Sequence, residues 1–191
     1  KASPAPSRTY PSLQPFGDGC SYSPFFKTLQ QMIAEKIIPK PIVVGETGCL
    51  VRLSNPPFEM LDVKYSMGSS IGIACGLWHS GVKDRILAVT GDSVFFHTAL
   101  NGLVNAAHHQ ADIIVVIMDN ETVALTGFQN RSGAGITAMG KNVRPIYPED
   151  MAKAMGIDNV YTLDAFDDKK IRKMLQQVFS LKGLSVVIVR G

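Results

Sequence analysis

Two nearly continuous apolar runs constrain the fold of this chain more than any other feature. Residues Ile86–Thr90 and Ile113–Met118 consist almost entirely of apolar side chains, most of them β-branched. Strands that are covered on both faces, as in parallel sheets, lose the usual alternation of polar and apolar residues. The segment 95–109 between the runs contains no proline, and we expect it to be a crossover helix that joins two parallel strands.

The rest of the chain continues this alternation of helices and strands. Apolar residues recur at helical spacing from Tyr22 to Ile37, and short β-branched runs at 42–44 and 185–189 predict two further strands. An amphipathic helix is expected at 168–181. The pattern predicts an α/β fold, with a doubly wound, mostly parallel sheet and helices on both faces.

The composition excludes global disorder and does not suggest a nucleic-acid or membrane partner. With 46% apolar and 18% charged residues over 191 positions, the chain can bury a sizeable core. Its net charge of +3 comes without a basic block, and no apolar run approaches the roughly 20 residues of a membrane span. Cys20, Cys49 and Cys75 form no CxxC pair, so we expect reduced thiols and a cytoplasmic protein.

The first residues differ in composition from the rest. Residues 1–16 contain four prolines among small polar residues, which is typical of an arm or linker. Such an arm is either a flexible leader or a segment that lies on a partner subunit, and a single domain is expected at 17–191. The chain starts at Lys1 and stops at Gly191, directly after an apolar run, so further sequence is expected beyond both ends.

Polar residues follow both central strands at the point where each strand ends. Gly91-Asp92-Ser93 follows one strand and Asp119-Asn120-Glu121-Thr122 follows the other. Ligands of doubly wound sheets bind beyond the carboxyl ends of the strands. Carboxylate and amide oxygens suit Mg²⁺, and free N–H groups at a helix start near Ser93 suit an anion. The pattern predicts a metal-bridged diphosphate, although a helix cap explains Asp92, and a turn explains Asn120, when each is taken alone.

Several motifs together resemble one enzyme family. GDS at 91–93 followed by DN at 119–120 is similar to the thiamine-diphosphate motif, which usually reads GDG and then NN. TGFQ at 126–129, GETGC at 45–49 and SMGSSIG at 66–72 resemble corresponding segments of the 2-oxoacid:ferredoxin oxidoreductases. The combination is more specific than any of these short motifs alone.

The stretch GDSVFFHTALNGLVNA at 91–106 most resembles the indolepyruvate branch, and the resemblance covers residues 17–191. It implies thiamine diphosphate and Mg²⁺ as cofactors, bound by the diphosphate-binding half of a thiamine-diphosphate fold. Asp92, Asn120 and the backbone oxygen of Thr122 are then the implied Mg²⁺ ligands. The implied cofactor-binding residues are Gly48, Cys49, Met67, Gly68, Gly91, Asp92, Ser93, Asn120, Thr122, Ala124 and Leu125.

The resemblance also implies individual roles. Met67 would support the bent cofactor from below, while N–H groups of Ser93 and of the Gly48–Cys49 turn would hold the diphosphate. Leu125 stands where pyruvate-using relatives often carry asparagine, so a bulkier or aryl substrate is expected. His97 is a further candidate for a substrate contact, although an ordinary surface or core histidine explains it as well.

The cysteines depart from the pattern of relatives that hold an iron–sulfur cluster. Gly17-Asp18-Gly19-Cys20 stands in place of their CxGC, so at most Cys20 and Cys49 of the four usual ligands are present. A cluster held by this segment alone is therefore not expected. Cys49 remains open as a cofactor neighbour, a cluster ligand or a core residue, and Cys75 is expected in the core.

One essential group is expected to come from elsewhere. Thiamine enzymes need a glutamate that hydrogen-bonds the pyrimidine ring of the cofactor, and in this family it belongs to a separate pyrimidine-binding domain. Glu46 does not match it. The resemblance thus implies a partner subunit or domain and a hetero-oligomer, and it implies that this chain alone is inactive.

The function implied by the resemblance is oxidation of a 2-oxo acid to an acyl-CoA, with ferredoxin as electron acceptor. In such enzymes the C2 ylid of the cofactor attacks the 2-oxo acid, which then loses CO₂. The depleted cysteine set favours an alternative, a non-redox 2-oxoacid decarboxylase or the small subunit of a 2-hydroxyacyl-CoA lyase or carboligase. A non-catalytic domain that keeps only the fold would be expected to lack Asp92 or Asn120, and both are present.

Overall fold

The main sheet is doubly wound and parallel throughout, which confirms the predicted fold class. The computed structural model describes residues 16, 17 and 19–191. The strand order is β2-β1-β3-β4-β8-β7, and each neighbouring pair is parallel. The strands are β1 (Ile42–Gly45), β2 (Val63–Lys64), β3 (Ile86–Gly91), β4 (Ile114–Asp119), β7 (Asn159–Asp164) and β8 (Ser185–Arg190).

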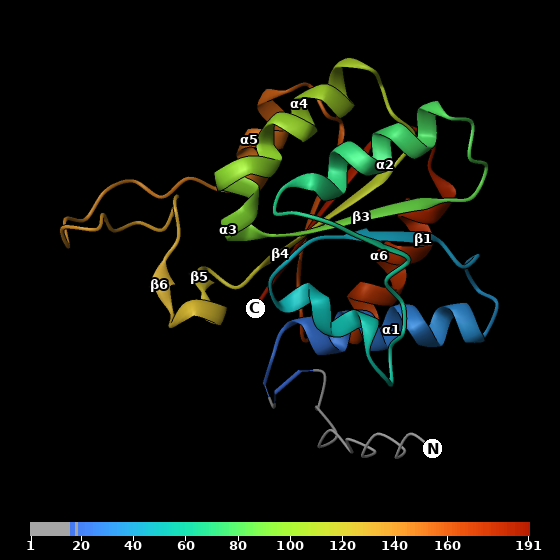
Figure 1. Ribbon diagram of the computed structural model, residues 1–191, viewed down its shortest axis with the longest axis horizontal. Coiled ribbons are helices and arrows are strands. Elements are labelled where there is room, and N and C mark those ends of the chain that lie inside the picture. The colour runs from blue at the N-terminus through green and yellow to red at the C-terminus, as the bar shows by residue number, and fades with distance from the viewer. Residues whose placement is uncertain (1–15, 18) are drawn as a thin grey trace, which may run out of the picture.

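Helices cover both faces of this sheet (Figure 1). On one face α1 (Tyr22–Ala34) packs against α6 (Asp168–Ser180). The other face carries α2 (Ser69–His79), α4 (Leu100–His108) and α5 (Pro148–Ala154). The predicted last helix and the four predicted strands agree with the structure to within one residue at each end.

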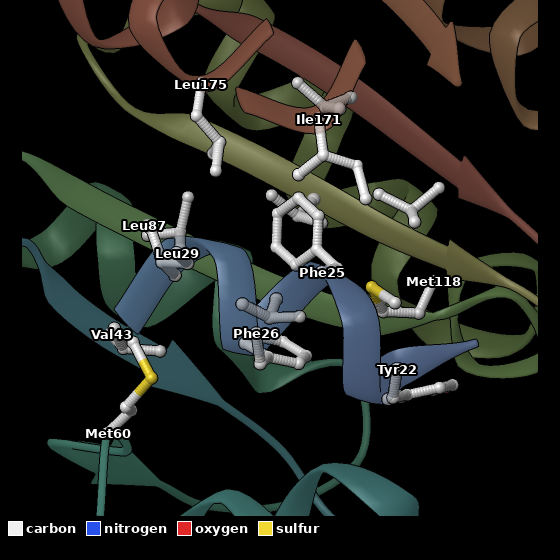
Figure 2. Close-up of a cluster of buried hydrophobic side chains, with 14 of the residues drawn as sticks. Tyr22, Phe25, Phe26, Leu29, Val43, Met60, Leu87, Met118, Ile171 and Leu175 are labelled. Carbon is white, nitrogen blue, oxygen red and sulfur yellow. The ribbon is translucent and has the colours of Figure 1, made fainter. Parts of the chain in front are cut away.

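Each face of the sheet has its own hydrophobic core, because the side chains of a strand point alternately to opposite faces. In β3, Leu87 and Val89 belong to the core under α1 and α6, whereas Ile86 and Ala88 belong to the core under α2 and α4. Figure 2 shows the first core, in which Phe25 of α1 is fully buried. Both sets of side chains must be apolar, and this explains the continuous apolar runs of the central strands.

β3 and β4 end at the same edge of the sheet. Gly91 pairs with Met118 in the parallel register, so Asp92 and Asp119 both follow directly at this edge. The expected meeting of the two polar segments is therefore confirmed.

The crossover helix starts before the proline-free segment 95–109, within one residue of the helix start expected near Ser93. The helical run begins with α3 (Asp92–Val94), continues through the π-helical turn η2 (Phe95–Ala99) and ends with α4. Its first residue is thus the aspartate of the GDS motif. A π-turn inside a helix often marks a functional site, and this one lies one turn from the strand edge.

Two other regions differ from the sequence-based expectation. α1 ends at Ala34, because Lys36 adopts a left-handed conformation with φ of 57°. Ile37 therefore lies outside the helix and is 41% exposed. Buried and exposed side chains do not alternate along the edge strand β7, which is partly exposed over most of its length. Its sequence therefore gives no clear strand signal.

A long connection leads from β4 to α5. It holds the antiparallel pair β5 (Thr122–Val123) and β6 (Gln129–Asn130), with the 3-10 turn η3 (Ala124–Thr126) between them. After Arg131, which stays at the strand edge, the chain extends away from the sheet before it reaches α5 (Figure 1). Another 3-10 turn, η1 (Cys49–Ser54), follows β1.

The arm predicted for residues 1–16 lies outside the described residues except for Phe16. This side chain is buried and its ring packs against those of Tyr22, Phe26 and Phe58. The domain boundary at residue 17 stays a prediction. Within the described part of the chain, no helix combines the length and the apolar character that a membrane crossing requires.

Candidate functional site

A pocket of about 310 Å³ lies at the carboxyl edge of the sheet, where β1, β3 and β4 end. It contains most of the residues that the motifs predict, and these come from four separate segments of the chain. The predicted residues in its wall are Gly48, Cys49, Met67, Gly91, Asp92, Ser93, Asn120, Thr122, Ala124 and Leu125.

Two predicted residues do not line this pocket. Gly68 lies directly behind Met67, in the turn before α2, and His97 lies in η2 with an exposed side chain. Six further residues line the pocket without having been predicted as site residues. They are Tyr22, Thr47, Leu50, Val94, Val123 and Thr126.

Tyr22 carries the most informative of these unpredicted side chains. It is 6% exposed, and a Cβ placed on Gly91 would lie 3.4 Å from its hydroxyl oxygen. Burial, and then the nearby Asp92 carboxylate, raise the pKa of Tyr22 well above its usual value, so the phenol keeps its proton. Its apolar helical spacing indicates only a core residue, and no local signal in the sequence reveals its place at the strand edge.

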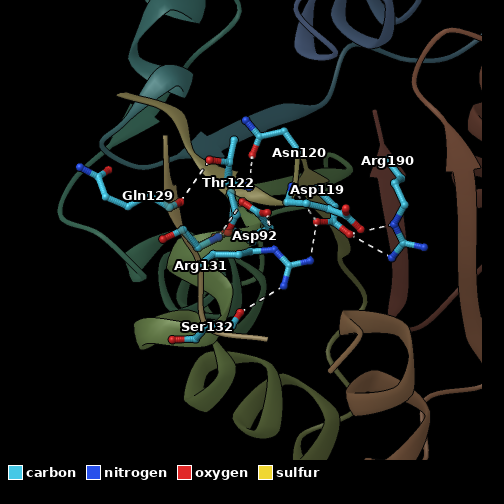
Figure 3. A network of polar contacts seen from close by, with 12 residues as sticks. Asp92, Asp119, Asn120, Thr122, Gln129, Arg131, Ser132 and Arg190 are labelled. Carbon is cyan, nitrogen blue, oxygen red and sulfur yellow. Dashed lines mark hydrogen bonds and ion pairs between the residues drawn. The ribbon is translucent and has the colours of Figure 1, made fainter. Parts of the chain in front are cut away.

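The Asp92 side chain lies in the pocket wall and has two close partners, and Figure 3 shows it beside Arg131. Its Oδ1 accepts a hydrogen bond of 2.7 Å from the backbone N–H of Ser93. Its Oδ2 forms an ion pair with Nε of Arg131 at 2.6 Å, although the two groups are not aligned for a hydrogen bond. Asp92 is only 2% exposed. Asp92 is not the N-cap of its helix, because it is the first helical residue and Gly91 before it occupies the N-cap position.

A chain of alternating charges continues from Asp92 away from the pocket. Nη2 of Arg131 donates to Oδ1 of Asp119 at 3.0 Å, and Nε of Arg190 donates to Oδ2 of Asp119 at 2.9 Å. Both terminal nitrogens of Arg190 donate to the carboxylate of Glu149, at 3.1 and 2.9 Å. Buried charged groups are tolerated when each is paired with a group of opposite charge. In this network each carboxylate contacts an arginine, and each arginine contacts two carboxylates.

Arg131 is a site residue that no motif in the sequence indicates. It lies in the long connection after β6, and its guanidinium stands over the ring of Phe96, 5.1 Å from the centroid. Its side chain is 1% exposed between the Asp92 and Asp119 carboxylates. Only the folding back of this connection brings it to the strand edge.

The network gives the carboxyl groups of Asp92 and Asp119 different pKa values. Burial, and then the neighbouring Asp119, raise the pKa of Asp92 to about 7, while Arg131 opposes this shift. Burial alone would raise the pKa of Asp119 too, but Arg131 and Arg190 outweigh it and lower that pKa. Asp119 is therefore the firmly ionised member of the pair.

The loop after β4 turns sharply between its two predicted metal ligands. Oδ1 of Asn120 accepts a long bond of 3.4 Å from the N–H of Thr122, and Glu121 between them is left-handed with φ of 58°. Among the described residues no group of three or more His, Cys, Asp or Glu side chains is arranged to hold a metal ion. A cation at this pocket thus meets one carboxylate and neutral oxygens, and Mg²⁺ accepts few protein ligands together with phosphate oxygens. The donor set fits that cation.

The turn at Gly48 and Cys49, after β1, is open to a ligand. Gly48 has φ of 103°, and a Cβ placed on it would meet no atom within 4 Å. Cys49 is half-buried, and this burial raises the pKa of its thiol, so the thiol stays protonated. Cys75 is buried in the core under α2, as expected.

Gly68 cannot carry a side chain without strain. Its φ is 76°, and an added Cβ would lie 2.6 Å from Cβ of Thr98. We therefore expect Gly68→Ala to lower the free energy of unfolding by about 1–3 kcal/mol, as measured by urea unfolding. Gly76→Ala is the matched control in α2, since an added Cβ meets nothing there, and it should raise that free energy by about 0.5–1 kcal/mol. Equal effects of the two substitutions would contradict the tight packing at Gly68.

Comparison with known proteins assigns the chain to a family. Residues 44–189 match the family model described as thiamine pyrophosphate enzyme, C-terminal TPP binding domain. The chain belongs to this family. The match includes the pocket-lining segments that follow β1, β3 and β4.

Curated relatives confirm the resemblance to the indolepyruvate branch. The indolepyruvate oxidoreductase subunit IorA of Archaeoglobus fulgidus is 31% identical over 99% of this chain and 29% of its own length. IorA of Thermococcus kodakarensis is 37% identical over 80% of this chain and 25% of its own length. This thiamine-pyrophosphate-binding chain thus spans less than a third of those relatives.

A solved structure shares the fold of this thiamine-pyrophosphate-binding domain. The 2-oxoglutarate:ferredoxin oxidoreductase from Magnetococcus marinus, solved with 2-oxoglutarate, coenzyme A and succinyl-CoA bound, superposes with a TM-score of 0.82. The superposition covers 95% of this chain and 64% of that chain, at 19% sequence identity. The two chains therefore share one fold.

Proposed function

We propose that this chain is the thiamine-diphosphate- and Mg²⁺-binding part of a 2-oxoacid:ferredoxin oxidoreductase of the indolepyruvate type, working in the cytoplasm. The observation that carries the proposal is the pocket at the strand edge, which gathers the GDS, DN and GETGC segments around one cavity. The IorA relatives support the same assignment.

In the proposed site, each residue has a task set by its chemistry. Asp92, Asn120 and the backbone oxygen of Thr122 offer oxygen ligands to Mg²⁺. The open turn at Gly48 and Ser93 at the start of the helical run bind the diphosphate, and the N–H of Ser93 exchanges its bond to Oδ1 of Asp92 for one to a phosphate oxygen. Met67 supports the rings of the cofactor, because its side chain lines the pocket and is 48% exposed.

The bound cofactor would supply the carbanion chemistry that decarboxylates a 2-oxo acid. The protein's own contribution in this chain is to hold and orient that group and to exclude water. The glutamate for the pyrimidine ring is assigned to a partner subunit or domain, which would close the open side of the pocket. Ferredoxin is the proposed electron acceptor, with coenzyme A as the acyl acceptor.

The proposed substrate is a 2-oxo acid with a bulky apolar or aryl side chain. Leu50, Val123 and Leu125 all line the pocket, and Leu125 is 60% exposed, so an apolar group can cover it. A small polar side chain would gain nothing from these contacts.

One observation favours a non-redox alternative. Only Cys20 and Cys49 lie near the site, Cys20 affecting the pKa of Cys49, and Cys75 is in the core. A cluster needs four ligands of this kind. A 2-oxoacid decarboxylase, or a 2-hydroxyacyl-CoA lyase or carboligase, would use the same pocket without a cluster in this chain.

The proposal is tested on the natively purified complex, with all chains that accompany this one. We expect thiamine diphosphate and Mg²⁺ in equal amounts, together with iron in a partner chain and reduction of ferredoxin by indolepyruvate and coenzyme A. Cofactor without iron or ferredoxin reduction would establish the non-redox alternative. A complex that binds no thiamine diphosphate would overturn both.

A further inference from the structure

Glu46 is a completely buried carboxylate directly after β1, and none of the roles proposed above uses it. Its side chain does not line the pocket, and its exposed fraction is 0%. Burial raises its pKa, so an isolated carboxyl group at this place would be costly to maintain. A carboxyl group at this place is therefore expected to make contacts that offset this cost.

The contacts of Glu46 join three segments that each carry part of the pocket wall. Oε2 accepts a bond of 2.8 Å from the backbone N–H of Gly68 and one of 3.3 Å from Oγ of Ser70. Oε1 accepts a bond of 2.5 Å from Oγ1 of Thr90, which directly precedes Gly91 and Asp92 in the chain. Glu46 itself precedes Thr47, Gly48 and Cys49 of the wall.

These contacts suit a carboxylate better than any other side chain of similar size. An ionised carboxylate only accepts hydrogen bonds, through two oxygens with about four acceptor positions. Here the donors come from both sides, the turn at Gly68 and the end of β3. An amide has a single oxygen, so it cannot accept from both sides at once.

We infer that Glu46 is a positioning residue, which ties the Met67–Gly68 turn to the Gly91–Asp92 strand end so that both walls of the cofactor site keep one fixed separation. The inference rests on the proposed function. Fixing Gly68 also positions the adjacent Met67, and fixing Thr90 positions Asp92, which follows two residues later. The carboxylate therefore acts on the cofactor through its neighbours and does not touch it.

The test compares Glu46→Gln with the unaltered complex, using thiamine diphosphate with Mg²⁺ as the probe. We expect the affinity to fall at least about tenfold, since residues behind ligand-binding groups usually contribute 10–100-fold. We also expect the near-ultraviolet circular dichroism of the bound cofactor to change at saturation, because the two walls no longer hold its rings at one angle.

A matched control separates positioning from ordinary stabilisation. Asp62→Asn is likewise a change from an acid to an amide. The Asp62 carboxylate also accepts a backbone hydrogen bond, from the N–H of Val43 in β1 at 2.8 Å, but it lies away from the pocket. This substitution should leave cofactor affinity and circular dichroism unchanged. Should Glu46→Gln fail to fold, Ser70→Ala removes one of the same bonds and is expected to weaken binding about two- to tenfold.

The outcomes distinguish the inference from the function on which it rests. An unaltered complex that does not bind the cofactor would overturn the proposed function itself. If that complex binds, but Glu46→Gln loses only unfolding stability and keeps the affinity and the cofactor signal, Glu46 is structural and the inference is wrong. Ser70→Ala with unaltered binding, where Glu46→Gln cannot be tested, would contradict it equally.

Discussion

Replacing Asp92 with asparagine is expected to lower the affinity of the complex for thiamine diphosphate with Mg²⁺ by at least about a hundredfold. The substitution removes the one carboxylate among the proposed metal ligands, and a hard divalent cation binds a neutral amide far more weakly. Asparagine keeps the shape of the side chain and an oxygen that can accept from Ser93. Asp92→Asn therefore disturbs fewer contacts than Asp92→Ala, which leaves Arg131 facing an empty space.

The measurement is a titration of the apo complex with thiamine diphosphate at fixed Mg²⁺, followed by intrinsic fluorescence. The control is Asp164→Asn, because Asp164 also ends a parallel strand and accepts from a following backbone N–H, that of Phe166 at 2.8 Å, but lies outside the pocket. Its affinity should equal that of the unaltered complex. Undiminished binding by the Asp92→Asn variant would refute the metal-ligand assignment.

The second large effect concerns stability. Arg131→Met is expected to lower the free energy of unfolding by about 3–5 kcal/mol, the usual cost of leaving a buried charge without its partner. Methionine has a similar length and can still pack on Phe96, so the lost volume is small. Asp92 would lose its only cation among the ion pairs of the described residues, while Asp119 would keep Arg190.

Urea unfolding of the apo protein measures this effect without any contribution from bound cofactor. Arg172→Met is the matched control, since Arg172 pairs with Glu35 in an exposed ion pair, at 2.7 Å. Exposed pairs contribute little, and this variant should unfold almost like the unaltered chain. A similar small effect of both substitutions would mean that the Asp92–Arg131–Asp119 network is not a stabilising unit.

The order and type of the main elements could be predicted from the sequence, because burial on both faces leaves a direct pattern. β3 and β4 read as continuous apolar runs since their side chains enter two cores. The edge strand β7 escaped prediction for the opposite reason. It is partly exposed, and a mixture of polar and apolar residues in a short segment has no distinct period.

The pocket residues were predictable where a short motif stands at a strand end. Asp92 and Asn120 follow strands whose direction and register the parallel arrangement dictates, so their meeting needs no further information. Tyr22 also lines the pocket, yet its position reads as ordinary core. Its helix packs on the sheet in a way that no local pattern specifies.

The sequence by itself determined the parallel α/β fold, the edge that carries the candidate site and the motifs to which we assign the proposed cofactor. Only the tertiary structure decided which charges surround Asp92 and what holds the walls of the pocket together. Arg131 and Glu46 reach their partners across turns and through the folding back of a long connection. Such contacts depend on distances between segments, and these arise only when the whole chain has packed.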